Sequence, residues 1–342
     1  MDFDHALLSQ WVEVEKLRNK RFFITGATGF FGLNLLESLL FLNKQFQLNM
    51  GLTVLVRDIN KASELFTRLS IDSNSVDWVE SDLLNVSEFD FGDKKFDFVL
   101  HFAANANWEL FQRQPEIERD IIIRGTDQML DLAKKLDCRK FIYLSSGAVY
   151  GKQPPEILKW KESDSEAYHS PDKDIYGSAK VQAEKNCRIF GEVHGLDCTI
   201  LRGFAFAGAH LKLNSHYAIG NLIGCALQGD TIVVKEGTTI RSYLYIVDAM
   251  IWILRAAVSD KAGGTYNLGS DESVAMEDLA YKISSITGNK DVRILSRPPH
   301  PNRYVPNIDL AKEELGVQVY TSLDQTIRHM IEWNEELKWK PS

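Results

Sequence analysis

The chain has 342 residues, 44% of them hydrophobic and 25% charged, as expected for a globular protein of one large or two smaller domains. Its 47 acidic side chains outnumber 39 basic ones, and this net charge of −8 argues against a nucleic-acid partner. No run reaches the ~18 apolar residues of a membrane span. The acidic N-terminal segment is unlike a signal peptide, and the four cysteines lack Cys-x-x-Cys spacing. We therefore expect a soluble, cytoplasmic protein with reduced thiols and no membrane partner.

Short apolar runs alternate with helical patterns over the first two hundred residues. An amphipathic helix is expected over residues 4–18, before the first strand. Strands are expected at 22–24, 52–56, 76–80, 96–102, 140–144 and 198–201, and helices at 31–42, 61–69, 116–136 and 174–193. This alternation predicts an α/β fold, a doubly wound (Rossmann) parallel sheet.

The alternation weakens after about residue 204. Short strands are expected at 231–234 and 242–247, and helices at 248–257, 276–287, 310–314 and 323–337. We therefore expect a dinucleotide-binding Rossmann domain over residues 1–203, including the N-terminal helix. A smaller mixed α/β substrate-binding domain is expected over residues 204–342, with segments that can interleave. The cleft between them, at the carboxyl edge of the sheet, is the expected ligand site.

A glycine motif follows the first predicted strand. Residues 21–32 read RFFITGATGFFG, with Gly26, Gly29 and Gly32 between the strand and a helix. Unpaired backbone N–H groups and a helix N-terminus meet at such a turn and bind a pyrophosphate. The glycines allow a tight turn, close approach of the phosphate and close packing of helix on strand. The alternative is a turn that merely connects two elements.

A tyrosine and a lysine lie four residues apart in YGSAK, within the helix predicted at 174–193. Tyr176 and Lys180 then project from one helix face. A neighbouring cation lowers the pKa of a phenol, which makes the pair a proton donor and acceptor for a hydroxyl or carbonyl group. Ser145 and Ser146 follow the fifth strand, where ligands bind, and can orient the reacting oxygen toward the tyrosine. A surface Tyr–Lys pair and a serine-capped turn are the alternatives.

The order of these motifs resembles the extended short-chain dehydrogenases/reductases, and within them the nucleotide-sugar epimerases and dehydratases. The resemblance is carried by TGATGFFG (25–32), SDL (81–83), HFAA (101–104), LSSGAVYG (144–151), YGSAK (176–180), LRGFAFAGA (201–209) and RSYLYIVDA (241–249). Weaker matches, YNLGSDE (266–272) and NRYVPNIDLAKEELG (302–316), extend it over nearly the whole chain.

The resemblance implies a role for each matching residue. The residues implied to bind the dinucleotide cofactor are Gly26, Gly29, Phe30, Phe31 and Gly32 at the pyrophosphate, Asp82 and Leu83 at the adenine, and Ala103 and Ala104 on the nicotinamide side. Tyr176 would be the catalytic acid–base, and Lys180 would hold the ribose and tune the tyrosine. Ser146 would share the substrate oxygen.

Two arginines match positions that the family uses for the substrate. The resemblance implies that Arg241 binds the diphosphate of a nucleotide sugar, a task that suits the bidentate guanidinium. Arg303 is implied as a second diphosphate contact. It also implies a homodimer, packed through the two long helices predicted at 116–136 and 174–193.

The chain departs from the family pattern where dehydratases carry an Asp-Glu pair to protonate the leaving hydroxyl and abstract a proton from C5. Those positions hold Gly147 and Ala148, which carry no proton, so 4,6-dehydration is disfavoured. Displaced acids at Glu109 or Asp164 would be required for it. A second departure is Ala205, in place of the asparagine usual in the sixth-strand motif.

The second predicted strand ends in Arg57 and Asp58. A carboxylate there binds the adenosine 2′-hydroxyl of NAD, whereas an arginine accommodates the 2′-phosphate of NADP. Because Arg57 stands at the strand end itself, we expect NADP(H), with NAD(H) as the alternative. A solvent-facing Arg–Asp pair is the structural alternative. No histidine has metal-ligand spacing, so no metal site is expected.

These features favour an enzyme that reduces a 4-keto (6-deoxy) nucleotide sugar by hydride transfer to C4. A nucleotide-sugar C4 epimerase with tightly bound NAD is the alternative. A 4,6-dehydratase and a non-catalytic dinucleotide-binding module rank lower, since Ser146, Tyr176 and Lys180 are all present.

Overall fold

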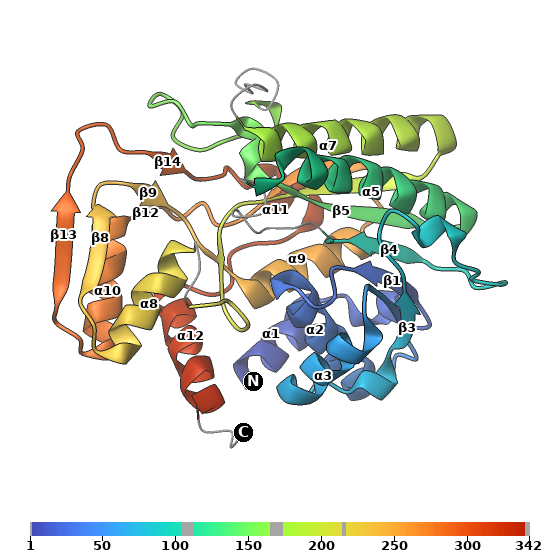
Figure 1. Ribbon diagram of the computed structural model, residues 1–342, viewed down its shortest axis with the longest axis horizontal. Coiled ribbons are helices and arrows are strands. Elements are labelled where there is room, and N and C mark those ends of the chain that lie inside the picture. Colours follow the sequence, from blue (N-terminus) through green and yellow to red (C-terminus); the bar gives the residue numbers. More distant parts are fainter. Residues whose placement is uncertain (1, 104–112, 165–173, 214–216, 339–342) are drawn as a thin grey trace.

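The computed structural model describes residues 2–103, 113–164, 174–213 and 217–338, and its centre is a parallel sheet of seven strands (Figure 1). The strand order is β11-β6-β5-β4-β1-β2-β3. These strands are β1 (Arg21–Thr25), β2 (Gly51–Val56), β3 (Asp77–Glu80), β4 (Phe98–His101), β5 (Lys140–Ser146), β6 (Asp197–Gly203) and β11 (Gly264–Leu268). The order reverses between β1 and β4, which is the position where doubly wound folds bind ligands. The predicted Rossmann fold is confirmed.

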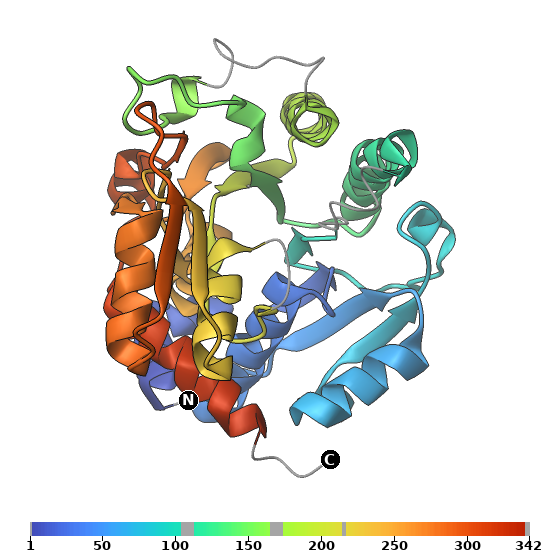
Figure 2. The same ribbon diagram turned by 60° about the vertical axis from the view of Figure 1, so that its left-hand side comes forward.

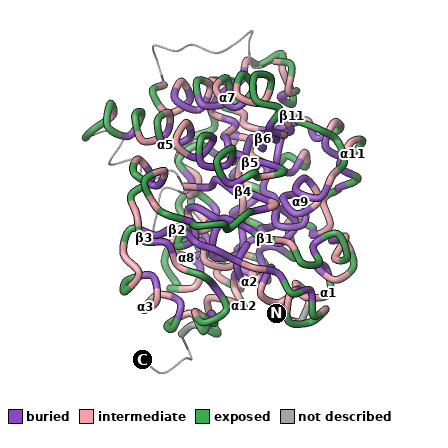
Figure 3. The backbone as a smooth tube through the Cα atoms, turned by 90° about the vertical axis from the view of Figure 1, so that its right-hand side faces the viewer, coloured by how far each residue is buried: buried purple, intermediate pink, exposed green. Residues whose placement is uncertain are grey.

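Helices cover both faces of this sheet. One apolar cluster packs one face against α1 (Asp2–Trp11), α2 (Phe30–Phe46), α3 (Ile59–Leu69) and α9 (Ile246–Val258). A second cluster packs the other face against α5 (Pro115–Lys135) and α7 (Ile175–His194), and Figure 3 shows that the strands between the helical layers are largely buried. The predicted helix over 4–18 ends earlier, at Trp11, and a short 3-10 turn, η1 (Val14–Leu17), follows it.

The second half of the chain builds a smaller unit beside the sheet. Its own apolar cluster packs α8 (Ala218–Gln228), α10 (Met276–Thr287) and α12 (Leu323–Lys338) with the parallel pair β8 (Ile232–Glu236) and β13 (Val292–Ser296). Figure 2 shows this pair standing apart from the central strands. The remaining elements are β7 (Phe206–Ala207), β9 (Ile240–Arg241), β10 (Leu244–Tyr245), β12 (Val274–Ala275), β14 (Arg303–Tyr304) and α11 (Asp309–Leu315).

Several elements of this half, among them helix α8 and strand β13, were not predicted from the sequence. The strand expected at 242–247 is wrong, since the chain forms the two-residue strands β9 and β10 and enters α9 at Ile246. Strand β11, which was not predicted, pairs in parallel with β6 at the edge of the central sheet. Segments from both halves therefore build the sheet. The domain boundary at residues 203/204 stays a prediction.

Two further expectations concern the whole chain. Among the helices that the structure describes, none combines the length and apolarity needed to cross a bilayer. All four cysteine thiols are free, and burial raises the pKa of Cys198 to about 12, which makes that thiol unreactive.

Candidate active site

The glycine loop forms a turn of close contacts between β1 and α2. Gly26 has φ +74°, and a Cβ there would lie 2.8 Å from the backbone N of Ala103. A Cβ on Gly32 would lie 2.5 Å from Cα of Ala27. Gly29 is the N-cap of α2 and donates its N–H to the Gly26 carbonyl at 3.0 Å. Side chains at Gly26 and Gly32 would collide with neighbouring backbone, so these glycines keep the turn tight and α2 close to β1. The N-terminus of α2 at this turn fits a pyrophosphate.

Thr25 ties this loop to the end of β4. Its hydroxyl accepts the N–H groups of Phe102 (3.2 Å) and Ala103 (3.1 Å), and donates to Nδ1 of His101 at 2.8 Å. Nε2 of His101 then donates to Thr126, 3.3 Å away, whose own hydroxyl donates to a carbonyl within α5. Burial lowers the pKa of His101 to about 3, so the ring is neutral. This histidine is structural.

Ser146, at the end of β5, lies close enough to two phenols for its hydroxyl to lower their pKa values. One is Tyr176 and the other is Tyr304 of β14. The Ser146 hydroxyl accepts the Ala148 N–H at 3.1 Å. Burial raises the pKa of Tyr176 to about 12, while the nearby Ser146 hydroxyl acts in the opposite direction. The structure thus brings Ser146 and Tyr176 together, and adds Tyr304.

Tyr304 was missed by the sequence analysis, which considered only its neighbour Arg303. Its phenol lies against Gly147, at one of the two positions that hold acids in dehydratases. The ring packs 4.7 Å from that of Phe204. Strand β14 has two residues, too few for a periodic pattern to predict it. The signal that the sequence offered here was the weak family match over residues 302–316, which pointed to Arg303.

Lys180 lies on the same face of α7, one turn after Tyr176. Its Nζ donates to the Leu144 carbonyl at 2.8 Å and lies 4.6 Å from the ring centroid of Tyr143. Burial lowers its pKa to about 8, and the Glu184 carboxylate one turn further acts in the opposite direction. The buried Lys180 side chain is therefore tied to the end of β5.

The first turn of α7 packs closely on the turn after β5. Asp174 is the N-cap, and its carboxylate accepts the Gly177 N–H at 3.0 Å. A Cβ at Gly177 would lie 2.6 Å from the Ala148 carbonyl oxygen. This close approach holds Tyr176 beside Ser146.

The two predicted diphosphate arginines lie on neighbouring strands. Strand β14 runs parallel to β9 and pairs Tyr304 with Arg241 and Arg303 with Ile240. Arg241 donates to the Ile240 carbonyl at 2.8 Å, and burial lowers its pKa. Side chains alternate along a strand, so Arg241 shares a face with Tyr304, whereas Arg303 lies on the opposite one. The structure therefore brings Arg241, rather than Arg303, to the hydroxyl cluster.

At the end of β2, Arg57 and Asp58 differ in their availability. Asp58 caps α3: its carboxylate accepts the Lys61 N–H at 3.0 Å and pairs with the Lys61 ammonium at 3.0 Å. The Lys61 N–H and ammonium lower the Asp58 pKa. Arg57 is exposed, and no ion pair within the described ranges holds it. Its guanidinium is thus the group at this strand end that is open to a ligand.

The other predicted cofactor residues lie along the same carboxyl edge. Asp82 follows β3, is exposed, and accepts a turn N–H at 2.9 Å, while Leu83 is buried. Phe30 and Phe31 are the first residues of α2, and the Phe31 ring packs 4.7 Å from an aromatic ring of β7. Ala104 lies outside the described residues.

Of the two acids considered for a displaced dehydratase mechanism, the structure describes only Asp164. Asp164 lies in a 3-10 turn, η5 (Glu162–Asp164), and its carboxylate accepts the Lys161 N–H at 2.8 Å. Glu109 is outside the described residues. Ala205 accepts the Leu244 N–H with its carbonyl, 3.0 Å away. In the part of the chain that the structure describes, no group of three acidic, histidine or cysteine side chains could hold a metal.

The sequence is also similar to known proteins. A family model described as "NAD dependent epimerase/dehydratase family" matches residues 22–269. UDP-glucuronic acid decarboxylase 6 of Arabidopsis thaliana is 26% identical over 88% of this chain and 86% of that protein. UDP-glucose 4-epimerase of Halalkalibacterium halodurans is 26% identical over 72% and 78%.

A solved structure matches the fold over most of both chains. It is UDP-glucuronic acid 4-epimerase from Bacillus cereus in complex with UDP-glucuronic acid and NAD, with a TM-score of 0.76, 23% identity, and coverage of 93% of this chain and 99% of that one. At this identity the likeness shows the fold alone.

Proposed function

Since the chain belongs to the NAD dependent epimerase/dehydratase family, we propose that it catalyses hydride transfer at C4 of a nucleotide sugar, with 4-epimerisation as the net reaction. The observation that carries this proposal is the hydroxyl cluster of Ser146, Tyr176 and Tyr304 beside Gly147. Phenols and a serine hydroxyl can bind and deprotonate a C4 hydroxyl. Elimination of water needs a stronger acid, and the cluster has no carboxylate at Gly147 or Ala148.

In this proposal each side chain handles the C4 oxygen. The Gly26 turn would hold a nicotinamide cofactor, whose chemistry would be to take up a hydride from C4 and return it to the other face of the sugar. Tyr176 takes the hydroxyl proton as the ketone forms and gives it back at the end, so no proton is consumed. Ser146 orients the oxygen, and the Lys180 ammonium favours the phenolate. Arg241 would hold the diphosphate.

The family description and the NAD complex named above support NAD as the cofactor. They do not support the NADP(H) preference that the sequence favoured. The test is the cofactor released when the purified protein is denatured, together with interconversion of UDP-glucose and UDP-galactose, and of the matching glucuronates, without added cofactor. Stoichiometric NAD⁺ and interconversion are expected. An empty protein that converts none of these sugars would refute the epimerase.

A second candidate is the reduction of a 4-keto nucleotide sugar by NADPH, because Arg57 is free and Asp58 is used as a helix cap. Under this candidate Arg57→Ala weakens NADPH at least tenfold more than NADH, since the guanidinium contacts the 2′-phosphate. Lys61→Met, a charge removed nearby, is the control. Equal losses for the two cofactors would exclude the contact.

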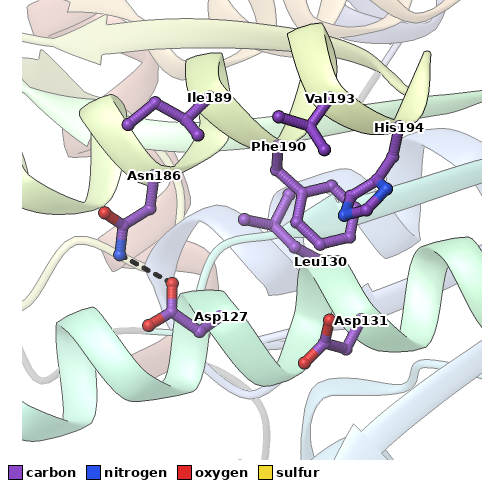
Figure 4. Close-up of a pocket in the computed structure, with 8 residues that line it drawn as sticks. All are labelled: Asp127, Leu130, Asp131, Asn186, Ile189, Phe190, Val193 and His194. Carbon is purple, nitrogen blue, oxygen red and sulfur yellow. Dashed lines mark hydrogen bonds between the residues drawn. The ribbon is translucent and has the colours of Figure 1, made fainter.

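The homodimer implied by the resemblance also has support. Between α5 and α7 lies a hollow of about 340 Å³, lined by Asp127, Leu130, Asp131, Asn186, Ile189, Phe190, Val193 and His194 (Figure 4). Ile189 is 48% and Val193 68% exposed. A second copy packing there would cover both, forming a four-helix bundle. Val193→Asp should then give monomers in sedimentation, whereas Val233→Asp on β8 should not. Monomeric wild type would contradict this.

A further inference from the structure

A buried ion pair behind the hydroxyl cluster has no part in the chemistry proposed above. Glu184 is 1% and Arg202 3% exposed, and the Glu184 carboxylate accepts from Nη2 of Arg202 at 2.7 Å. Removing two charges from water costs free energy, and an apolar pair often fills such a space at no loss of stability. Glu184 follows Tyr176 and Lys180 at four-residue steps, on the same face of α7. The ion pair therefore lies one helical turn beyond Lys180, next to the candidate active site.

The last three residues of β5 lie against three successive turns of α7. The Leu144 carbonyl accepts from Lys180 at 2.8 Å, and the Ser145 hydroxyl donates to Glu184 at 2.6 Å. Ser146 lies close enough to Tyr176 to lower the pKa of its phenol. Ser146 and Tyr176 are the groups proposed to handle the substrate oxygen. The Ser145–Glu184 bond is buried and joins the same strand and helix.

The Glu184 carboxylate is itself held from other elements. Arg202 donates a second bond to it through Nε at 2.9 Å. The guanidinium also donates to the hydroxyl of Tyr150 at 3.0 Å, and that hydroxyl donates to Asn267 of β11 at 2.5 Å. Strands β6 and β11 and the turn after β5 thus anchor one carboxylate. A buried, fully bonded network of this kind fixes one geometry.

We propose that Glu184 is a positioning residue: it holds the end of β5 against α7, so that Ser146 and Tyr176 meet at the substrate oxygen. This inference rests on the proposed function of the Ser146–Tyr176 pair. The carboxylate is buried and acts through its bond to Ser145.

The experiment removes the hydrogen bond from Ser145 to Glu184 and keeps the Glu184–Arg202 ion pair. Ser145→Ala is expected to lower kcat by about tenfold to a hundredfold with KM unchanged, because small misplacements of reacting groups are costly. Ser145→Thr restores the hydroxyl and should restore kcat. Arg188→Gln is the matched control, since Arg188 meets the same carboxylate from the solvent side at 3.3 Å and is 44% exposed. Wild-type kcat in Ser145→Ala would overturn the positioning role of Glu184.

The wild-type enzyme separates the two proposals. If it converts no nucleotide sugar, the proposed function fails, and the positioning role of Glu184 is then tested by amide hydrogen exchange. Faster exchange over residues 144–148 in Ser145→Ala than in Arg188→Gln supports that role. Equal exchange in the two variants overturns it.

Discussion

The phenol of Tyr304 fills the space beside Gly147 that any larger side chain would need. A Cβ at Gly147 would lie 2.9 Å from Cζ of Tyr304 and 3.0 Å from Cε1 of Phe204. The position at which dehydratases carry an acid is therefore closed by an aromatic ring from β14. In this structure the Gly147 position therefore has no room for an acidic side chain.

Gly147→Ala should destabilise the protein by about 1–3 kcal/mol, because the added methyl group overpacks the contact with Tyr304. Urea denaturation measures this. The double variant Gly147→Ala with Tyr304→Ala should lose less than the sum of the single losses, since the cavity accepts the methyl group. Additive losses would show that the two residues do not compete for space.

Tyr176→Phe should lower turnover by about 10²–10⁴-fold, the usual contribution of a general acid–base, and leave cofactor binding nearly unchanged. Steady-state kinetics and cofactor titration measure the two effects. Tyr281→Phe, at a phenol that is 51% exposed on α10, is the control. Substantial activity in Tyr176→Phe would remove the acid–base role.

The stability of the protein should fall as the pH drops from about 6.5 toward 3 because of His101. The folded state keeps this ring neutral with a pKa of about 3, while the unfolded chain binds a proton near pH 6.5. In that window the unfolded state holds one more proton than the folded state. The free energy of unfolding therefore falls by up to about 1.4 kcal/mol for each unit by which the pH is lowered. His101→Gln should reduce this slope and the exposed His194→Gln should not. Equal slopes in wild type and His101→Gln would contradict the buried neutral ring.

Thr25→Val should lower stability by about 1–3 kcal/mol and weaken cofactor binding. The valine has the shape of threonine but leaves the N–H groups of Phe102 and Ala103 without their acceptor. These groups fix the loop that faces the glycine turn. Thr25→Ser keeps the hydroxyl and is the control. Isothermal titration with NAD⁺ and thermal unfolding measure the two effects, and tight binding in Thr25→Val would show that the tie is dispensable.

The sequence predicted most of the first two hundred residues because their elements are long and locally encoded. Strands β1, β2 and β5 are apolar runs, and α5 and α7 are long enough for their period to show. Tyr176 and Lys180 were placed together because helix geometry alone relates residues four apart. By contrast β9, β10 and β14 have two residues each, and so short a segment has no period to detect.

The sequence by itself determined the strand–glycine–helix turn at Gly26 and the Tyr176–Lys180 pair, since both depend on backbone conformation over a few neighbouring residues. Tertiary structure alone decided that Tyr304 stands beside Gly147 and that Glu184 and Arg202 are paired behind Ser145. These contacts join residues far apart in the chain. Their partners are chosen by how the sheet, α7 and β14 pack, and not by local periodicity.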